Sequence, residues 1–200
     1  MIAIIDYGMG NLYSVEKAFV KLGAEVVVTS DSETIAKADK VVLPGVGAFG
    51  DCMKNLSDSG LIPVIKTVIE KGTPFLGICL GLQLLFEGSE ENPGVQGLGI
   101  FPGQVKRIVA PNLKIPHMGW NSLEMRSTSP LFSELHPKSY VYFVHSYHAV
   151  PLEDNIVTAV TDYGGPVTAA VGKGNIQAVQ FHPEKSSTVG MEILQNFIKI

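Results

Sequence analysis

The chain has 200 residues, of which 46% are hydrophobic, and it carries a formal net charge of -4 with a pI near 5.7. This composition is sufficient for one large core, and it does not shift along the chain, so we expect a single domain over residues 1–200. The acidic balance provides no basic face for nucleic acid. No apolar run approaches the ~20 residues that span a bilayer, and the N-terminus lacks a basic region before a cleavable stretch. We therefore expect a cytoplasmic protein.

Short apolar stretches alternate with helical patterns in the first part of the chain. This repeat predicts a parallel sheet that helices cover on both faces. Ligands of such sheets bind at the carboxyl ends of the strands, and Cys79, the turn at Gly45 and the turn of residues 6–11 fall at that edge. The predicted strands are residues 1–5, 25–29, 40–43 and 75–78, and the predicted helices are residues 11–22, 49–56 and 61–70.

After Gly88 the pattern changes to short strands interrupted by glycine and proline. We interpret these strands as antiparallel additions to the parallel core. The predicted fold class is therefore α/β, with three layers: a mainly parallel central sheet, helices on both faces, and added antiparallel strands. The predicted strands here are residues 139–150, 156–160, 167–171 and 176–180, and residues 188–198 form the predicted closing helix.

The segment Gly77-Ile-Cys79-Leu-Gly81 places a thiol between two glycines. Residues 73–78 indicate a buried strand and residues 80–87 are apolar at helical spacing, so Cys79 is expected on the sharp turn of a nucleophile elbow. Unpaired N–H groups and the positive end of a helix dipole would favour a thiolate there. The same pattern would also suit an esterase-like hydrolase, a protease or a thiol-redox protein.

A second motif, Gln180-Phe-His182-Pro-Glu184, follows a predicted strand near the C-terminus. Pro183 biases the backbone of His182 toward extended conformations, and residues two apart in an extended segment project to the same side. Glu184 can therefore reach the imidazole of His182. A carboxylate on one ring nitrogen leaves the other nitrogen free to take a proton from a thiol. The sequence thus predicts a catalytic triad of Cys79, His182 and Glu184.

The remaining histidines and the second cysteine carry weaker signals. His136 lies in a loop-like segment and is interpreted as a solvated surface residue. His117, His145 and His148 have no carboxylate two residues away, and either structural hydrogen bonding or a binding role is open for each. Cys52 lacks a glycine frame and is interpreted as a buried structural residue, with no disulfide expected in a reducing cytoplasm. Paired zinc-ligand spacing is absent, so we expect no metal and no cofactor.

Both motifs resemble those of the class I (triad-type) glutamine amidotransferases, and the resemblance covers essentially the whole chain. It implies a flavodoxin-like core and the hydrolysis of L-glutamine to L-glutamate and ammonia through a thioester on Cys79. Three further segments are similar to the glutaminase subunits of imidazole glycerol phosphate synthases. They are residues 5–12 (Ile-Asp-Tyr-Gly-Met-Gly-Asn-Leu), 116–121 (Pro-His-Met-Gly-Trp-Asn) and 142–147 (Tyr-Phe-Val-His-Ser-Tyr).

The resemblance also implies an oxyanion hole. The backbone N–H of Leu80, the residue after the nucleophile, is one donor. Val46 and Gly47, in the Gly-rich turn of residues 44–47, would supply the second, although a plain strand-to-helix turn is the alternative. A phosphate-binding role for this turn is the weaker interpretation, because no Lys-Ser/Thr pair follows the glycines.

Substrate-binding residues are implied by the same resemblance. Gln83 and Glu91 match positions that contact bound glutamine, and the Glu91 carboxylate suits the ammonium group. His145, Ser146 and Tyr147 match a strand that lines the pocket. For Glu91 the alternative is an ordinary solvated acidic loop.

The family further implies a heterodimer with a barrel-shaped cyclase subunit. That partner uses the ammonia to form imidazole glycerol phosphate and an aminoimidazole carboxamide ribonucleotide in histidine biosynthesis. Asn11, Trp120, Tyr142 and Lys185 lie in segments expected to face it, although core packing is open for Trp120 and a solvated charge for Lys185. Two other functions remain: the glutaminase component of another synthase, such as anthranilate synthase, and a non-catalytic glutamine-binding regulatory module.

Overall fold

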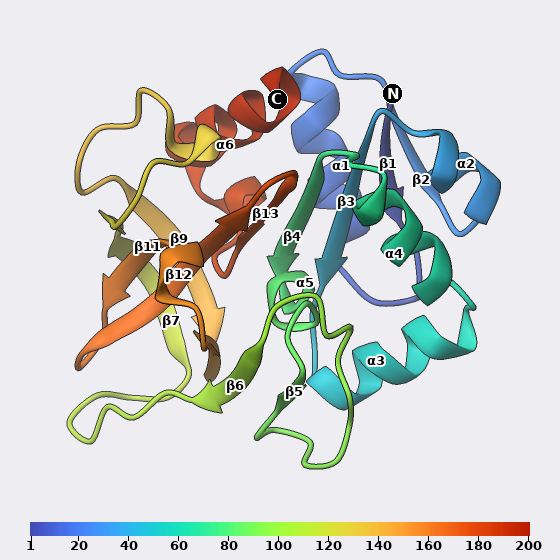
Figure 1. The fold of residues 1–200 in the computed structure, drawn as a ribbon. Coiled ribbons are helices and arrows are strands. Elements are labelled where there is room, and N and C mark those ends of the chain that lie inside the picture. Colours follow the sequence, from blue (N-terminus) through green and yellow to red (C-terminus); the bar gives the residue numbers. More distant parts are fainter.

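The computed structural model describes residues 1–200, and its centre is an eight-stranded sheet (Figure 1). Five strands run parallel, in the spatial order β2 (Val26–Thr29), β1 (Ile2–Ile5), β3 (Lys40–Gly45), β4 (Phe75–Cys79) and β13 (Ile176–Val179). The sheet continues with the antiparallel strands β12 (Pro166–Lys173), β11 (Val157–Asp162) and β8 (Glu124–Met125). The parallel part has the flavodoxin-like order.

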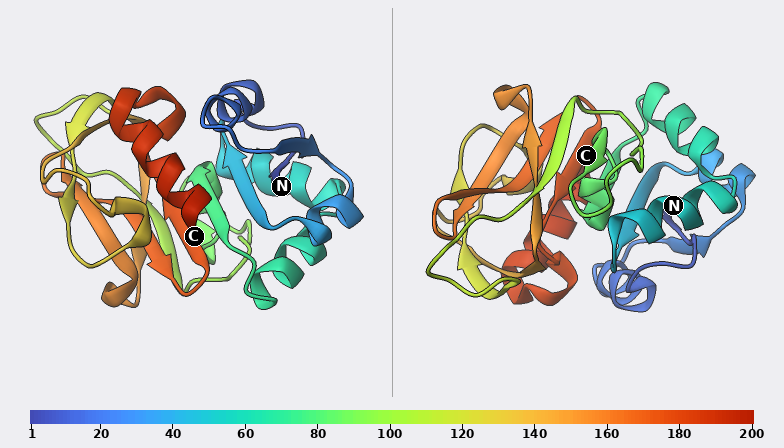
Figure 2. Two further views of the ribbon diagram at one scale, coloured as in Figure 1. Left: turned by 90° about the horizontal axis from the view of Figure 1, so that it is seen from above. Right: turned by 90° about the horizontal axis from the view of Figure 1, so that it is seen from below.

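Helices cover both faces of the parallel strands (Figure 2). On one face α1 (Leu12–Lys21) lies beside α6 (Ser187–Lys199), and on the other are α2 (Ser32–Lys37), α3 (Phe49–Asp58) and α4 (Ile62–Glu70). The predicted three-layer α/β fold is therefore confirmed. Every residue of β1 and β4 is buried, as expected for strands covered on both faces. None of the helices has the length and apolar character needed to cross a lipid bilayer.

Two smaller sheets complete the structure. One joins β10 (Tyr147–Pro151), β6 (Gly103–Arg107) and β5 (Gly88–Ser89), and the other pairs β7 (His117–Ser122) with β9 (Tyr140–His145). The short helical turns are α5 (Leu80–Gln83), η1 (Pro130–Phe132), η2 (Asp154–Ile156) and η3 (Pro183–Lys185).

The last predicted strand is placed differently from our expectation. The prediction made residues 176–180 an antiparallel addition, but β13 pairs in parallel with β4, with Val179 opposite Ile78. The chain thus returns to the central sheet after building its antiparallel part, and only the other edge of β13 is antiparallel, against β12. This return gives β13 a place in the core that short-range sequence pattern does not reveal.

Two element predictions differ in extent, and one helix was not predicted. The helix predicted over residues 80–87 ends at Gln83, because backbone N–H groups of residues 97–101 donate to the carbonyl groups of residues 84–87. The strand predicted over residues 139–150 is divided at Ser146 between β9 and β10, which pair with different partners. Helix α2 was not predicted; it begins after Asp31, whose side chain accepts a hydrogen bond from the Thr34 backbone N–H.

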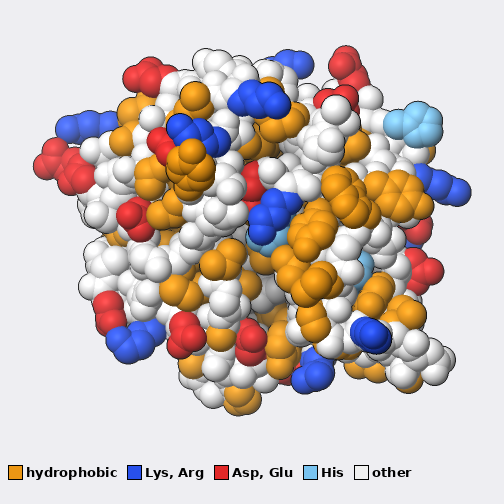
Figure 3. All heavy atoms as spheres, turned by 180° about the vertical axis from the view of Figure 1, so that it is seen from behind, with side chains coloured by type: hydrophobic (Ala, Val, Ile, Leu, Met, Phe, Trp, Pro, Cys, Tyr) orange, Lys and Arg blue, Asp and Glu red, His pale blue; other side chains and the backbone are white.

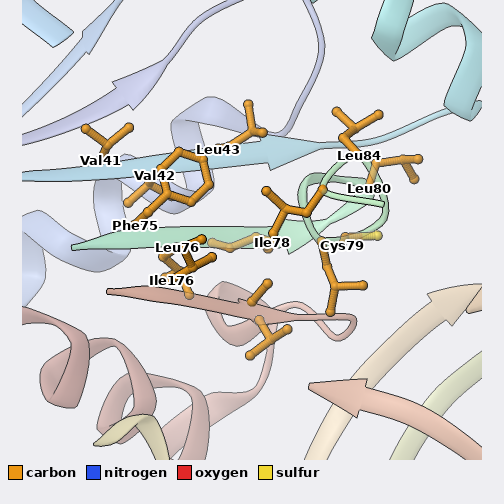
Figure 4. Close-up of a cluster of buried hydrophobic side chains, with 14 of the residues drawn as sticks. Val41, Val42, Leu43, Phe75, Leu76, Ile78, Cys79, Leu80, Leu84 and Ile176 are labelled. Atoms are coloured by element: carbon orange, nitrogen blue, oxygen red, sulfur yellow. The ribbon is translucent and has the colours of Figure 1, made fainter. Parts of the chain in front are cut away.

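The main core is a cluster of 50 buried hydrophobic residues, and β3 and β4 run through it. Figure 4 shows the packed side chains of these strands, with Leu80 and Leu84 beyond the end of β4. The backbone of α5 lies close to the carbonyl group of Leu43 on β3. This close approach depends on Gly81. A Cβ atom at Gly81 would lie 1.9 Å from the carbonyl oxygen of Leu43.

We expect Gly81→Ala to destabilise the protein by roughly 3 kcal/mol or to prevent folding, because the added methyl group meets backbone rather than a movable side chain. Chemical denaturation of both proteins measures the change. Gly94→Ala is the control, since Gly94 has nothing within 4 Å of an added Cβ atom and only its positive φ opposes the change. Equal stability losses in the two variants would contradict the prediction.

Candidate active site

Cys79 stands on a strained turn at the carboxyl edge of the central sheet. It is the last residue of β4, and α5 begins at the next residue. Its backbone has φ 55° and ψ -112°, a left-handed conformation that is rare for a residue with a side chain. The flanking glycines permit the turn: a Cβ atom at Gly77 would lie 2.8 Å from the carbonyl oxygen of Gly81. The geometry is that of a nucleophile elbow.

His182 and Glu184 form a buried pair beyond the end of β13. His182 Nδ1 lies 2.8 Å from Glu184 Oε1, and the two side chains are only 3% and 1% exposed. His182 has an extended backbone, with φ -102° and ψ 96°, as its position before Pro183 predicts. The segment does not continue as an extended strand: residues Pro183–Lys185 form the 3₁₀ turn η3, and this turn brings Glu184 to the imidazole. The carboxylate occupies Nδ1, so Nε2 is left for the proton exchanged with a reactant.

The electrostatic environment keeps His182 protonated. Burial lowers the pKa of His182, but the side chains of Cys79 and Glu184 together raise it by more than burial lowers it. The net effect is a pKa of about 10. An imidazole between two acidic groups gains more from their attraction than it loses by desolvation. Since α5 has only four residues, the helix dipole at Cys79 is smaller than the sequence suggested. The imidazolium of His182 is the main cation beside the sulfur.

The Gly-rich turn lies directly beside the nucleophile. Gly45 pairs with Cys79 in the β3–β4 register, so Val46 and Gly47 follow at the same edge. The backbone N–H groups of Val46 and Gly47 donate no hydrogen bond within the protein. Together with Leu80, the first residue of α5, they are the oxyanion-hole residues expected from the sequence, and the fold brings all three next to the elbow.

Two side chains hold the carbonyl groups of this turn. The Tyr7 hydroxyl donates to the Pro44 carbonyl at 2.8 Å, and the Cys52 thiol donates to the Val46 carbonyl at 3.4 Å. Burial raises the pKa of Cys52 to about 11, so its thiol keeps the proton that it donates. Cys52 is fully buried, as predicted, and both cysteines are free thiols. The contact with Val46 was not foreseen, because it joins residues on opposite sides of the turn.

Gln83 and Tyr147 lie together behind the nucleophile. The Gln83 amide donates to the backbone carbonyl of Tyr147 at 3.1 Å and to the side-chain oxygen of Gln180 at 2.9 Å. The Gln180 amide in turn donates to Cys79 Sγ at 3.8 Å. Both N–H groups of Gln83 are therefore used inside the protein, and its amide oxygen is the atom left for a ligand.

Glu91 is not the solvated loop residue of the alternative interpretation. Its carboxylate accepts a hydrogen bond from the Phe49 backbone N–H at 2.8 Å, and Asn92 accepts one from Gly50 at the same distance. These contacts cap the N-terminus of α3, where Ala48 offers no side-chain cap. The second oxygen of Glu91 is left for other contacts.

His145 and His117 form a second buried pair near the pocket. His117 Nδ1 lies 2.9 Å from His145 Nε2, and His145 Nδ1 lies 2.8 Å from the Tyr147 carbonyl. Ser146, between the two strands, is partly buried. His136 is exposed, as predicted, whereas His148 accepts a hydrogen bond from the Thr168 backbone N–H.

The residues expected to face a partner lie on β7, on β9, on η3 and just before α1. Trp120 on β7 pairs with Tyr142 on β9, and their rings meet edge to face at 6.2 Å. Trp120 is 53% exposed, which excludes the core-packing interpretation. The backbone carbonyl of Tyr142 accepts from the His182 N–H, and Lys185 is exposed on η3 beside α1, which follows Asn11. Figure 3 shows hydrophobic side chains gathered on the face opposite to the view of Figure 1.

One surface hollow is lined by Glu184 but not by the nucleophile. Its volume is about 760 Å³ and it lies between α1 and α6, with Lys17, Lys21 and Glu184 among its lining residues. Glu184 thus contacts His182 of the triad and also lies at the wall of this hollow. No group of three or more His, Cys, Asp or Glu side chains could hold a metal ion.

One residue of the site was quoted in a motif without being given a role. Gln180 is fully buried and is the residue whose amide reaches Cys79. It precedes His182 by two positions, the spacing that was used to place Glu184. The same alternation along an extended segment therefore points Gln180 toward the site.

Comparisons with known proteins agree with this geometry. The family model described as "Glutamine amidotransferase class-I" matches residues 3–200. The imidazole glycerol phosphate synthase subunit HisH of Geobacter metallireducens is 54% identical over 98% of this chain and 96% of its own length. That of Thermosynechococcus vestitus is also 54% identical, over 100% of this chain and 96% of its own.

Solved structures support the fold independently. The crystal structure of a glutamine amidotransferase, 19% identical, superposes with a TM-score of 0.77 over 100% of this chain and 98% of its own. At that identity the likeness shows the fold, whereas the sequence relatives and the family model show the family. The chain belongs to the class-I glutamine amidotransferases, and within them to the HisH subunits of imidazole glycerol phosphate synthase.

Proposed function

We propose that this chain hydrolyses L-glutamine at Cys79 and passes the ammonia to a cyclase subunit in histidine biosynthesis. The observation that carries the proposal is the buried His182–Glu184 pair beside a thiol on a strained elbow. Family membership supports the substrate, and the triad supports catalysis rather than glutamine sensing. The whole of residues 1–200 is proposed to act as one glutaminase domain, and the single 50-residue cluster supports this.

The first chemical step uses the thiolate and imidazolium together. Cys79 Sγ attacks the side-chain amide carbon of glutamine, and the negative charge moves to the amide oxygen. Collapse of this intermediate breaks the C–N bond while His182 Nε2 gives its proton to the departing nitrogen, so that ammonia leaves and a thioester remains. Glu184 holds the ring in the orientation that makes this transfer possible.

The second step regenerates the enzyme. Neutral His182 takes a proton from water, and the resulting hydroxide attacks the thioester carbon. When the C–S bond breaks, glutamate is released and the Cys79 thiolate again faces an imidazolium. In both steps the backbone N–H groups of Leu80 and of Val46 or Gly47 donate to the oxyanion. The unpaired N–H groups of Val46 and Gly47 beside the elbow support this assignment.

Glutamine is proposed to bind between the elbow and the start of β10. Gln83 offers its remaining amide oxygen, and Glu91 offers its remaining carboxylate oxygen to the ammonium group of the substrate. Backbone groups of residues 145–147 form the other wall. The cyclase partner is proposed to cover Asn11, Trp120, Tyr142 and Lys185, since ammonia released at Cys79 would otherwise escape into water.

The whole proposal is tested by glutamate production from glutamine, measured for the chain alone and with a purified cyclase subunit and its nucleotide ligand. Strong stimulation that requires both additions supports the assignment. Full activity without the cyclase, or none with it, would leave the fold and family standing and point to another synthase partner.

Cys79→Ser should lower glutamate production at least about 1,000-fold while glutamine still binds, because a hydroxyl is a far weaker nucleophile than the thiolate. Turnover is measured with purified protein, and binding by calorimetry. Cys52→Ser is the matched control: its hydroxyl can still donate to the Val46 carbonyl, so activity should be retained. Turnover of the Cys79→Ser variant near the wild-type rate would exclude Cys79 as the nucleophile.

A pH profile tests the charge on His182. Since the pKa of His182 is raised from 6.5 to about 10, activity should fall as the pH rises through about 10. Its contribution to stability has the same sign: it is fully present below pH 6.5 and is lost as the pH rises through about 10. Glu184→Gln removes one charge that holds the proton, so the alkaline limb should move to lower pH and the neutral-pH rate should drop roughly 100-fold.

The control for this variant is Glu192→Gln, the same change at an exposed position of α6. Its profile should match that of the wild type. An alkaline limb that stays in place in Glu184→Gln would mean that the carboxylate does not set the protonation of His182.

Trp120→Ala should weaken cyclase binding roughly 30-fold and lower the ligand-stimulated glutaminase rate at limiting cyclase, because half-exposed tryptophans in partner-facing strands are common hot spots. Affinity is measured by titration with the purified cyclase. Leu152→Ala removes a side chain that is 77% exposed outside the proposed interface, and it should leave the affinity unchanged. Wild-type affinity and stimulation in the Trp120 variant would place the interface elsewhere.

A further inference from the structure

A continuous chain of hydrogen bonds runs from β7 to the nucleophile, and the triad does not use it. Its first member is Asn121, next to the exposed Trp120, and its last contact is on Cys79 Sγ. The links are 2.8 to 3.2 Å long except for the final contact with sulfur, which is 3.8 Å. In order, the members are Asn121, His117, His145, the Tyr147 carbonyl, Gln83, Gln180 and Cys79.

The fixed chemistry of a carbonyl group determines the direction of every histidine bond. The Tyr147 carbonyl can only accept, so His145 must carry its proton on Nδ1 and present Nε2 as an acceptor. His117 therefore donates from Nδ1 to His145, and its own Nε2 accepts from the Asn121 amide. Both imidazoles are neutral, and each has one tautomer only.

Burial reinforces this single arrangement. His117 and His145 are 2% and 6% exposed, and burial lowers the pKa of His117 to about 4 and that of His145 to about 3. The His117 ring is stacked on Phe143 at 4.6 Å and on Tyr163 at 4.1 Å, which fixes its plane. Neither ring gains a proton near neutral pH, so the sequence of donors stays the same.

At the other end, two glutamines bring the chain to the sulfur. The Gln83 amide spends one N–H on the Tyr147 carbonyl and the other on the Gln180 oxygen. With its oxygen held in this way, Gln180 must turn its own amide N–H groups toward Cys79. Gln180 is fully buried. An amide donor on a thiolate both stabilises the charge and fixes the direction of the sulfur.

We propose that Gln180 is a positioning residue for the Cys79 sulfur and that the hydrogen-bond chain from Asn121 holds Gln180 in place. The inference rests on the proposed glutaminase function, because the sulfur is positioned for attack on the glutamine amide. The orientation of the nucleophile then depends on β7, the strand that carries Trp120 in the proposed cyclase interface.

The first test compares Gln180→Leu with Gln177→Leu in the complex with the cyclase subunit and its nucleotide ligand. Gln177 lies on the same strand and is also buried, but it contacts Ser129 instead of the site. We expect Gln180→Leu to lower kcat roughly tenfold or more, with KM within about twofold of wild type, because a donor to a charged group is lost. Gln177→Leu should keep the wild-type kcat.

A second readout separates positioning from general damage to the fold. A glutamine-shaped chloroketone must meet a correctly directed sulfur, whereas iodoacetamide needs only an accessible thiolate. In Gln180→Leu the chloroketone should modify Cys79 about tenfold more slowly and iodoacetamide at a rate within about twofold of wild type. A large rise in the iodoacetamide rate would mean local unfolding and would overturn the positioning role. So would a wild-type kcat, or an equal loss in Gln177→Leu.

The upstream part of the chain is tested with His117→Phe, which keeps an aromatic ring between Phe143 and Tyr163 but removes both hydrogen bonds. We expect a loss of kcat in this variant, and no further loss when it is combined with Gln180→Leu. Losses of kcat that multiply in the double variant would contradict the proposal that the hydrogen-bond chain acts through Gln180. If Gln180→Leu fails to fold, Gln180→Met takes its place in both comparisons.

The two modification rates also separate this inference from the proposed function. They report on Cys79 whether or not glutamine is turned over. Wild-type protein that makes no glutamate in the complex would contradict the proposed function, whereas equal chloroketone rates in wild type and Gln180→Leu would contradict the positioning role alone.

Discussion

Parallel pairing of β13 with β4 is the interaction on which the site depends. Gln180 and Cys79 are 101 positions apart in the chain, yet the register that sets Val179 opposite Ile78 brings them into contact. On the other edge of β4, the pairing of Gly45 with Cys79 delivers the Gly-rich turn. The segments that follow β3, β4 and β13 therefore meet at one edge of the sheet, and each supplies one part of the chemistry.

The charges of the site follow from that placement. His182 is buried beside the side chains of Cys79 and Glu184, and their attraction outweighs the loss of solvation. The two histidines of the neighbouring pair face no carboxylate, so burial, the largest effect on each, lowers their pKa values and keeps them neutral, and neighbouring histidines lower the pKa of His145 further. Within a short distance the protein thus holds one imidazole charged and two uncharged, and the difference lies in the partners rather than in the depth of burial.

The sequence was sufficient for the local features and insufficient for the long-range ones. The strand-to-helix turn at Cys79 follows from its flanking glycines, and the extended backbone of His182 follows from Pro183. The pairing of Glu184 with His182 was predicted correctly, although a 3₁₀ turn rather than an extended segment produces it. The parallel placement of β13 and the end of α5 at Gln83 depend on contacts with distant segments, and hydrophobic pattern carries no information about them. The chain through His117 was missed for the same reason, because it joins residues that only the fold brings together. The Cys52 contact with Val46 spans only six positions and was missed because it depends on the exact path of the turn between them.

The left-handed backbone of Cys79 sets stability and chemistry in opposition at one residue. A side chain in this conformation costs about 1–2 kcal/mol that glycine would not. Replacing the nucleophile by glycine would therefore make the fold easier to maintain while removing the reaction. Selection for stability alone would not keep a cysteine at this position, so its presence there reflects a requirement of function rather than of folding.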